Sequence, residues 1–530
     1  MTNSEIIEQT QTWLKTHHAV TRIWQHDASL WKSDADHQTI IQNALGWLTV
    51  AELVSRDVPH LLSFAHSLEN EGYTDIVVLG MGGSSLISDV ISHLFPSNPP
   101  ALRLHILDST HPVAIRQLTA ALPLARTLFV FASKSGTTAE PSAYYRYFWQ
   151  LLQQAGVRAG HHFIAITDPG THLEALAKEQ GFREIFLNPA DIGGRYSALS
   201  WFGMLPAAVS GAPVDEILSQ AQIMMKQCRQ DNLSDNPGAA LGTILGGFAK
   251  NGRDKITLLF PEEFSIFADW VEQLLAESTG KEGTGLIPIA HEPELPLNSY
   301  GSDRTFIAYL NPEHTDLSNR LDALEQAGHP VMRLALPDKK ALGAECFRWE
   351  FATAIAGAVL NIDAFDQPNV QEGKDNTVAT LATVKKTGHL PAVPDEKEEA
   401  PFLFSSAHIP SADTVQDTLT AWWNTHHDSD YVAIMAYMPM TDSTTQILQQ
   451  MREILGTNGH LATTLGYGPR FLHSTGQLYK GGNNHGLFLQ IVDNSGPAIK
   501  IPGEPYDFLT FIQAQALGDY FALTHHQRRV

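Results

Sequence analysis

Apolar and polar residues follow two different periods along the chain, and the change comes near residue 73. Before it, apolar residues recur at helical spacing, as in Ile41, Leu45 and Leu48, which predicts a helical segment over residues 1–72. After it, short apolar runs end at turn-type residues and alternate with helical stretches; the first four runs are DIVVLG, RLHILD, TLFVFAS and HFIAITD. This alternation predicts a parallel sheet with helices on both faces.

A second cycle of the same kind follows. The runs ITLLFP, TFIAYL and PVMRLALP are predicted strands, and a helix over about 343–360, apolar nearly all round in its second half, is predicted to be buried between layers. The stretch 385–402, rich in proline and charge, is predicted to be a linker or a long exposed connection. Beyond it, the runs YVAIMAYM, HLATTLGYG and GLFLQIV indicate a further α/β unit, closed by a helix over about 506–523.

These patterns predict an α/β protein built of two doubly wound domains, with parallel sheets flanked by helices, and a C-terminal α/β extension. The expected limits are 1–72 for the helical segment, 73–230 and 231–388 for the two domains, and 389–530 for the extension. The pattern leaves open whether the extension folds independently or completes the second sheet.

Net charge limits the partners that this chain can have. Its 530 residues are 43% hydrophobic, which is enough to bury at least two cores. With 35 Lys and Arg against 57 Asp and Glu, the net charge of -22 repels nucleic acid and anionic membrane surfaces. The same charge disfavours a small anionic substrate at long range, so a phosphate site has to work through local backbone N–H groups and hydroxyls.

Cysteines and histidines indicate neither a disulfide framework nor a metal site. Cys228 and Cys346 lie far apart without paired spacing, which fits a reducing compartment. The N-terminus lacks the pattern of a leader, and no run of about 18 apolar residues occurs, so a soluble, cytoplasmic protein is expected. The stretches HHDSD and HHQRR are interpreted as solvated surface, and no structural metal is predicted.

The strongest candidate for an anion site is the segment VFASKSGTTAEPSA. A predicted strand is followed by side-chain donors around one glycine and then by a helix start near Pro141; the donors are Ser133, Lys134, Ser135, Thr137 and Thr138. The free N–H groups and the positive dipole end at a helix start attract an anion. The competing interpretation is a serine and threonine N-cap without a ligand. The loop GMGGSS after the first predicted strand poses the same choice between a phosphate-cradling turn and an ordinary connection.

Three other segments carry candidate side chains. In DIGGRYS, Arg195 follows two glycines, where the backbone can approach a ligand and the guanidinium can be held over it, although turns with arginine are common. In AESTGKEGTG, Glu277 ends an amphipathic helix and is either a general base at a cleft edge or a solvated helix-terminal glutamate. In FDQPNVQEGKD, Lys374 is either catalytic or a surface cation.

Together the segments resemble a known family. SKSGTT resembles the phosphate loop of sugar isomerase (SIS) domains, while DIGGRYS and the pattern FDQxxVxxxK resemble signatures of the glucose-6-phosphate isomerases. GMGGSS and ESTGKEGTG are similar to the GxGGS loop and the glutamate segment of that family. These matches run in order from Asp75 to Lys374, and their combination is specific although each is weak.

The resemblance implies two SIS domains and an aldose–ketose isomerase of glycolysis and gluconeogenesis. It would interconvert D-glucose 6-phosphate and D-fructose 6-phosphate through a cis-enediol without a metal or redox cofactor, as a homodimer with sites completed across the interface. Glu277 would move the proton between C1 and C2, Arg195 would steady the enediolate oxygens, and Lys374 would open the ring with a histidine. The phosphate is expected at Ser84, Ser133, Lys134, Ser135, Thr137 and Thr138, and the substrate at Gly83 and Gly194.

The chain departs from the family pattern at two places. Gln371 stands where the lysine motif has glutamate, and Glu372 follows it. The histidine segment LHSTGQ lies at 472–477, after the FDQ motif instead of before it, so ring opening is assigned to His473, with His291 in reserve. This order resembles the isomerase portion of transaldolase/glucose-6-phosphate isomerase fusion proteins. No transaldolase segment is visible, and the isomerase half alone is expected.

Two other classes of function stay open at this point. One is a different SIS-type isomerase acting on mannose 6-phosphate or glucosamine 6-phosphate, against which the GGRYS and FDQxxVxxxK matches stand. The other is a noncatalytic sugar-phosphate sensor, which would need SKSGTT but neither Glu277 nor Arg195.

Overall fold

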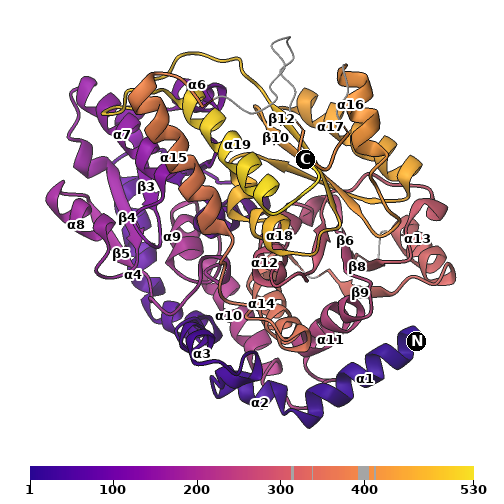
Figure 1. Cartoon of the computed structure of the whole chain (residues 1–530). Helices are drawn as coiled ribbons and strands as arrows, with labels where there is room; N and C mark the ends of the chain where they lie inside the picture. The colour runs from indigo at the N-terminus through magenta and orange to yellow at the C-terminus, as the bar shows by residue number, and fades with distance from the viewer. Residues whose placement is uncertain (312–314, 337, 392–404, 411–413) are drawn as a thin grey trace.

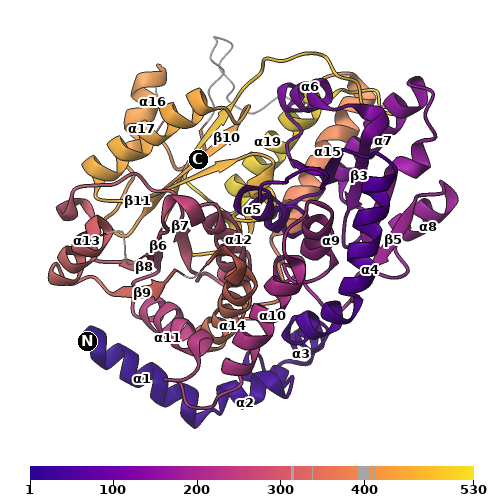
Figure 2. The same cartoon turned by 180° about the vertical axis from the view of Figure 1, so that it is seen from behind.

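The computed structural model in Figures 1 and 2 describes residues 1–311, 315–336, 338–391, 405–410 and 414–530. It is an α/β protein whose three sheets are parallel and flanked by helices, which confirms the predicted fold class. No helix within these residues is long and apolar enough to cross a membrane. The predicted helical start is also confirmed, with helices α1 (Asn3–Thr16), α2 (Ala19–Trp24), α3 (Ala35–Gln42) and α4 (Val50–Asn70).

The first sheet has five strands in the order β2-β1-β3-β4-β5. Its strands are β1 (Asp75–Leu79), β2 (Arg103–Leu107), β3 (Thr127–Ala132), β4 (Phe163–Thr167) and β5 (Glu184–Leu187). Alternate residues of β1 face opposite layers: Ile76 and Val78 pack in the core that includes α4, while Val77 and Leu79 pack in a second core. The helices around this sheet are α5 (Leu86–Leu94), α6 (Pro112–Ala121), α7 (Ala139–Gln154), α8 (His172–Glu179) and α9 (Trp201–Val209).

The second sheet has four strands in the order β7-β6-β8-β9. They are β6 (Lys255–Leu259), β7 (Ile287–Ile289), β8 (Arg304–Leu310) and β9 (Val331–Ala335). The apolar helix expected here is α14 (Leu342–Leu360), which is buried over most of its length and packs on α11 (Pro237–Lys250). The other helices of this region are α10 (Val214–Gln227), α12 (Phe267–Thr279), α13 (Thr315–Gln326) and α15 (Val370–Thr387).

A separate three-stranded sheet, β11-β10-β12, forms the C-terminal extension. Its strands and helices are β10 (Tyr431–Tyr437), β11 (Ala462–Tyr467), β12 (Gly486–Val492), α16 (Val415–Trp423), α17 (Asp442–Gly459), α18 (Gly476–Gly481) and α19 (Phe508–His525). Its edge strand β11 lies against β7, where the Arg452 side chain donates to the carbonyls of Ala290 and Thr463. The extension thus has a separate sheet, which packs against the edge of the second sheet. Its last helix, α19, runs beside α15 (Figure 1).

Three details differ from the sequence-based expectation. Strands β5 and β7 were not predicted; β7 has only three residues and contains Pro288, so it carries almost no periodic signal. The expected connection over 385–402 begins too early, because residues 385–387 form the last turn of α15. Residues 392–402 of this stretch lie outside the described residues.

Candidate active site

The candidate side chains gather in one cleft where the loops after neighbouring strands β1, β3 and β4 meet α12 and α15. Loops at the carboxyl ends of parallel strands are the usual place for a ligand in such sheets. The cleft has a volume of about 770 Å³. Among the predicted residues, its lining includes Gly83, Ser84, Lys134, Ser135, Thr138, Gly194, Arg195, Glu277, Lys374 and His473. Six segments that are distant in the sequence therefore line one cleft.

The loop between β3 and α7 keeps the features of an anion site. Gly136 has φ +68°, a conformation that glycine adopts readily, and its N–H donates to Ser133 Oγ (3.1 Å). Thr138 occupies the N-cap position of α7, yet its side chain caps no N–H of the helix. The first turn of α7 is thus not closed by its own cap, which disagrees with the N-cap interpretation and leaves amide donors at the cleft.

Two residues that were predicted to bind phosphate instead make hydrogen bonds or ion pairs to other residues of the protein. Ser133 is buried, with its hydroxyl 3.0 Å from Thr138 Oγ1. Lys134 binds the carboxylate of Asp168 and donates to the carbonyl of Ala190 (2.8 Å). Burial raises the pKa of Asp168 although Lys134 opposes this. Lys134 therefore anchors the loop. Thr137 lines an adjoining cavity that also reaches Lys374 and His473.

The glycines of the two other loops allow a close approach of their backbones. A Cβ on Gly83 would lie 2.0 Å from the carbonyl oxygen of Gly194, so a side chain there would clash with backbone. Ser197 Oγ donates to that carbonyl (2.6 Å) and holds the turn. Ser84 lies next to this contact, 9% exposed, and its hydroxyl has no partner among the described residues.

Arg195 is 1% exposed and is fixed on all sides. Its Nη1 lies 3.5 Å from Glu277 Oε1. The guanidinium donates to Ser278 Oγ (2.7 Å), Gln367 Oε1 (2.8 Å), Ala364 O (2.8 Å) and Asp366 O (2.9 Å). The FDQ segment and α12 thus hold one rigid cation at the cleft floor. Such a cation is prepared for negative charge that develops on a bound molecule.

Glu277 lies in the last turn of α12, with its side chain 13% exposed. Its Oε2 accepts a hydrogen bond from Gln273 Nε2 (3.0 Å), and Arg195 faces its other oxygen. This placement disagrees with the interpretation as a solvated helix-terminal glutamate. A carboxylate held between an amide and a guanidinium, and facing a cleft, can act as a general base.

His473 ends the 3-10 helix η10 (Arg470–His473) and reaches the cleft from the C-terminal extension. Its Nε2 lies 2.9 Å from Oε1 of Glu140, a buried residue of α7 that also accepts from Gln515 Nε2 (2.7 Å). Burial alone would raise the pKa of Glu140, but the charge and the hydrogen bond of His473 outweigh it and lower that pKa. Glu140 was not predicted; the only signal was its place two residues after Thr138.

The alternative histidine lies elsewhere. His291 Nε2 is 2.5 Å from Asp269 Oδ1, and neither residue lines the cleft. Of the two histidines, the structure therefore brings His473, and not His291, to the other candidates.

Glu372, which follows Gln371 in the lysine motif, does not line the cleft. Glu372 Oε1 and Oε2 lie 2.6 Å from His525 Nδ1 and 2.7 Å from His526 Nε2. Lys374 lines the cleft and makes no hydrogen bond within the described part of the chain. Among the described residues, two clusters of side chains could hold a metal ion. One comprises Glu372, His525 and His526, and the other comprises His37, Asp363 and Asp366. None of these side chains lines the cleft.

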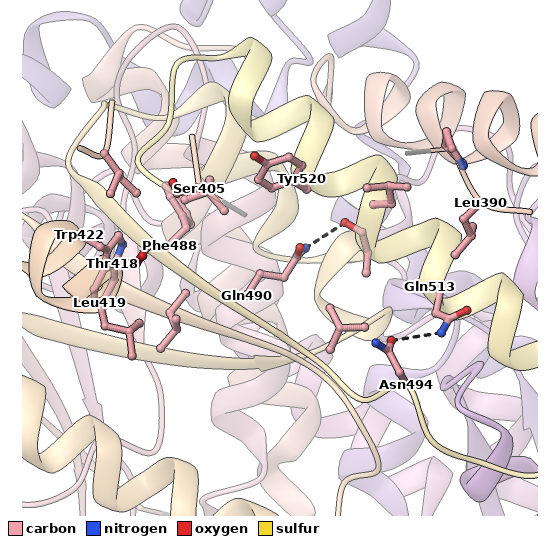
Figure 3. Close-up of a pocket in the computed structure, with 17 residues that line it drawn as sticks. Leu390, Ser405, Thr418, Leu419, Trp422, Phe488, Gln490, Asn494, Gln513 and Tyr520 are labelled. Atoms are coloured by element: carbon pink, nitrogen blue, oxygen red, sulfur yellow. Dashed lines mark hydrogen bonds between the residues drawn. The ribbon is translucent and has the colours of Figure 1, made fainter. Parts of the chain in front are cut away.

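A second cavity of about 330 Å³ lies between β12 and α19, and Figure 3 shows its side chains. Its walls are mainly apolar, as at Trp422 and Phe488, and two of its amides are already paired: Gln490 donates to Ala516 O and Gln513 to Asn494. No Asp, Glu, Lys, Arg or His is among the described residues that line it. This cavity therefore offers none of the acidic or basic side chains that line the cleft.

Comparisons with known proteins point to one family. The family described as phosphoglucose isomerase matches residues 67–286, a range that includes Ser84, Arg195 and Glu277. A glucose-6-phosphate isomerase of Cyanothece sp. is 31% identical over 354 residues, 59% of this chain and 67% of that protein. One of Thermosynechococcus vestitus is 30% identical over 351 residues, 58% of this chain and 66% of that protein. The matches thus span about two thirds of these relatives.

Solved structures share the fold. A hypothetical protein from Thermus thermophilus aligns with TM-score 0.60 and 24% identity over 72% of this chain and 97% of that one. A glucose-6-phosphate isomerase from Chlamydia trachomatis aligns with TM-score 0.57 and 17% identity over 73% of this chain and 87% of that one. The resemblance seen in the sequence is confirmed: the chain belongs to the glucose-6-phosphate isomerase family.

Proposed function

We propose that this protein is an aldose–ketose isomerase that interconverts D-glucose 6-phosphate and D-fructose 6-phosphate in glycolysis and gluconeogenesis. The observation that carries the proposal is the pair of Arg195 and Glu277, 3.5 Å apart, in the same cleft as the loop over residues 133–138. A base and a fixed cation that share a cleft with an anion site are the groups that proton transfer next to a carbonyl of a sugar phosphate requires.

The phosphate is bound by hydroxyls and amides. In our proposal Ser84, Ser135 and Thr138 donate to it together with the free amides at the start of α7, and Thr137 borders the same position. Ser133 does not line the cleft, and the Lys134 ammonium is bound to Asp168 and to the carbonyl of Ala190, so both support the loop without contacting the phosphate. Neutral donors suit a chain with a net charge of -22, since they need no compensating carboxylate.

Glu277 takes the proton from C2 of the aldose and returns it to C1, and the reverse reaction uses the same carboxylate. The enediolate formed between these steps carries negative charge on its oxygens. Arg195 stabilises this charge, which in comparable oxyanion sites is worth about 3 to 4 kcal/mol. Gly83 and Gly194 let the backbone lie close to the sugar.

The substrate reaches the site as a closed ring, so an acid–base pair has to open it. We assign this step to His473 and Lys374, one taking the proton of the anomeric hydroxyl while the other donates a proton to the ring oxygen. The ionised carboxylate of Glu140 accepts a hydrogen bond from His473 Nε2 and so orients the ring. Lys374 lines the cleft, makes no hydrogen bond or close ion pair among the described residues, and has the charge of Glu140 nearby.

An isomerase fits the cleft better than a sensor does. Binding alone would need only the phosphate loop, whereas a buried arginine fixed beside a carboxylate is a costly arrangement without a reaction to use it.

We further propose a homodimer in the cytoplasm, as the family resemblance implies and as two buried, unpaired thiols permit.

The test is the appearance of glucose 6-phosphate from fructose 6-phosphate, coupled to its oxidation, with protein dialysed against a metal chelator. Turnover by the wild type and its loss in E277Q are expected. The matched control is E282Q, since Glu282 lies five residues further with a side chain 45% exposed and pairs with Lys32. Mannose 6-phosphate and glucosamine 6-phosphate, assayed in parallel, should be poor substrates. Full activity of E277Q would contradict the mechanism.

A further inference from the structure

Arg470 begins the short helix that ends at His473, and it joins three parts of the molecule. Its guanidinium faces three carboxylates, each with a different nitrogen: Nη2 binds Asp89, Nε lies 2.6 Å from Asp108 Oδ2, and Nη1 lies 3.5 Å from Asp269 Oδ2. Asp89 is on α5 and Asp108 follows β2, both in the first sheet region, while Asp269 is on α12, the helix of Glu277. Arg470 itself belongs to the C-terminal extension.

The contacts fix one end of η10, and the cleft fixes the other. Phe471 is 2% exposed and packs in the extension. At the far end, the backbone carbonyl of His473 accepts from Gln273 Nε2 (2.9 Å), and a Cβ on Gly82 would come within 2.6 Å of the same oxygen. One helical turn thus separates the arginine from the histidine, so a shift of the first moves the second.

Charge makes this contact difficult to replace. One guanidinium compensates three carboxylates that come from two helices and one loop, and all its nitrogens are used. A lysine has one nitrogen and could not reach three carboxylates in different directions. Without the guanidinium, the carboxylates would repel one another beside η10, and the extension would lose these three ion pairs to the other two sheet regions.

We propose that Arg470 is a positioning residue, which docks the C-terminal extension on α5, β2 and α12 and thereby holds His473 in place for ring opening. This inference rests on the function proposed above. It also assigns a role to the extension, namely to carry the ring-opening histidine into the cleft from outside the two sheets that hold the phosphate loop and the base.

The test separates ring opening from proton transfer by the choice of substrate. Fructose 6-phosphate must be opened, whereas 5-deoxyfructose 6-phosphate lacks the hydroxyl that closes the ring and needs only the Glu277 step. For R470M we expect kcat/KM to fall about 100-fold on fructose 6-phosphate, because misplacing a reacting group by about 1 Å has an effect of this size. On the open-chain analogue, followed by NMR, the fall should stay within about threefold. H473Q should show the same split.

Controls keep the outcomes apart. R333M removes another arginine that binds two carboxylates, Asp322 and Glu325, far from the cleft in sequence and fold, and should leave both substrates unaffected. R470K should behave like R470M. If R470M does not fold, D108N removes one of the three contacts and should give a weaker form of the split. Equal losses on both substrates, or no loss, would overturn the role of Arg470, whereas a wild type without turnover or an active E277Q would overturn the proposed function itself.

Discussion

The two halves of the cleft are built in different ways. Apart from Ser84, the half that we propose to bind phosphate is one continuous segment, from the end of β3 through residues 133–138 to the start of α7. The half that we propose for acid–base chemistry combines Arg195, Glu277, Lys374 and His473, which come from four separate elements and, in the last case, from a different sheet region. A local turn can thus prepare an anion site almost alone, while the chemistry depends on packing between distant parts of the chain.

The comparison leads to different kinetic expectations for the two halves. Changes in the acid–base half should lower kcat, because they act on the transition state. Changes in the phosphate half should raise KM, because they act on binding that ground state and transition state share.

The largest effect is expected at the base. E277Q removes the carboxylate and keeps the shape, so kcat should fall about 1000-fold or more with little change in KM. The coupled assay with fructose 6-phosphate measures this, with E282Q as the surface control. A large rise in KM at unchanged kcat would show that Glu277 contributes to substrate binding and not to proton transfer.

The cation beside the base comes next. R195K keeps the charge but cannot reproduce the set of four donated hydrogen bonds, so kcat should fall about 100-fold. The matched control is R183K, which changes an arginine paired with Glu71 outside the cleft. An R195K protein with wild-type kcat would show that charge alone, without the fixed geometry, is sufficient.

A smaller effect is expected in the phosphate half. S135A and T138A each remove one hydroxyl at the loop, and each should raise KM about tenfold while kcat changes little, since a hydrogen bond to a charged group contributes about 1.5–3 kcal/mol. Steady-state kinetics with fructose 6-phosphate tests this. S67A, which removes a hydroxyl on α4 outside the cleft, should have no effect. Losses in kcat alone would erase the difference between the halves.

The smallest effect concerns stability near the Arg470 contacts. Burial, and next to it the charge of Asp269, raises the pKa of Glu272 to about 8 from its ordinary value of 4.5. The folded state therefore holds this proton more tightly, so the stabilising contribution is complete below pH 4.5 and is lost as the pH rises through about 8. Glutamine imitates the protonated form at every pH.

E272Q should consequently melt at a higher temperature than the wild type at pH 8.5, by about 1 °C for each kcal/mol recovered in a chain of 530 residues, and at nearly the same temperature at pH 4.5. Differential scanning calorimetry at the two pH values checks this. E263Q is the control, because Glu263 is an exposed residue in the segment before the same helix. An equal or lower melting temperature of E272Q at pH 8.5 would mean that Glu272 is ionised without cost.

The local features were predictable because they depend on neighbours in the sequence. Periods of two and 3.6 residues located most strands and the buried helix α14, and the cluster of small donors marked the loop at 133–138. The short strands β5 and β7 were not predicted, because three or four residues are too few to show a hydrophobic periodicity. The domain limits at 72, 230 and 388 stay a prediction.

The sequence by itself determined the fold class, the family and the residue types of the cleft, since these follow from local periodicity and from motifs whose spacing is covalent. Only the tertiary structure decided that His473 and not His291 reaches the cleft, that Glu140 stands behind it, and that Glu372 turns away toward α19. It also decided that Arg470 ties the extension to both other sheets. Such contacts join residues hundreds of positions apart, and their geometry arises from the packing of helices and sheets, which no local pattern encodes.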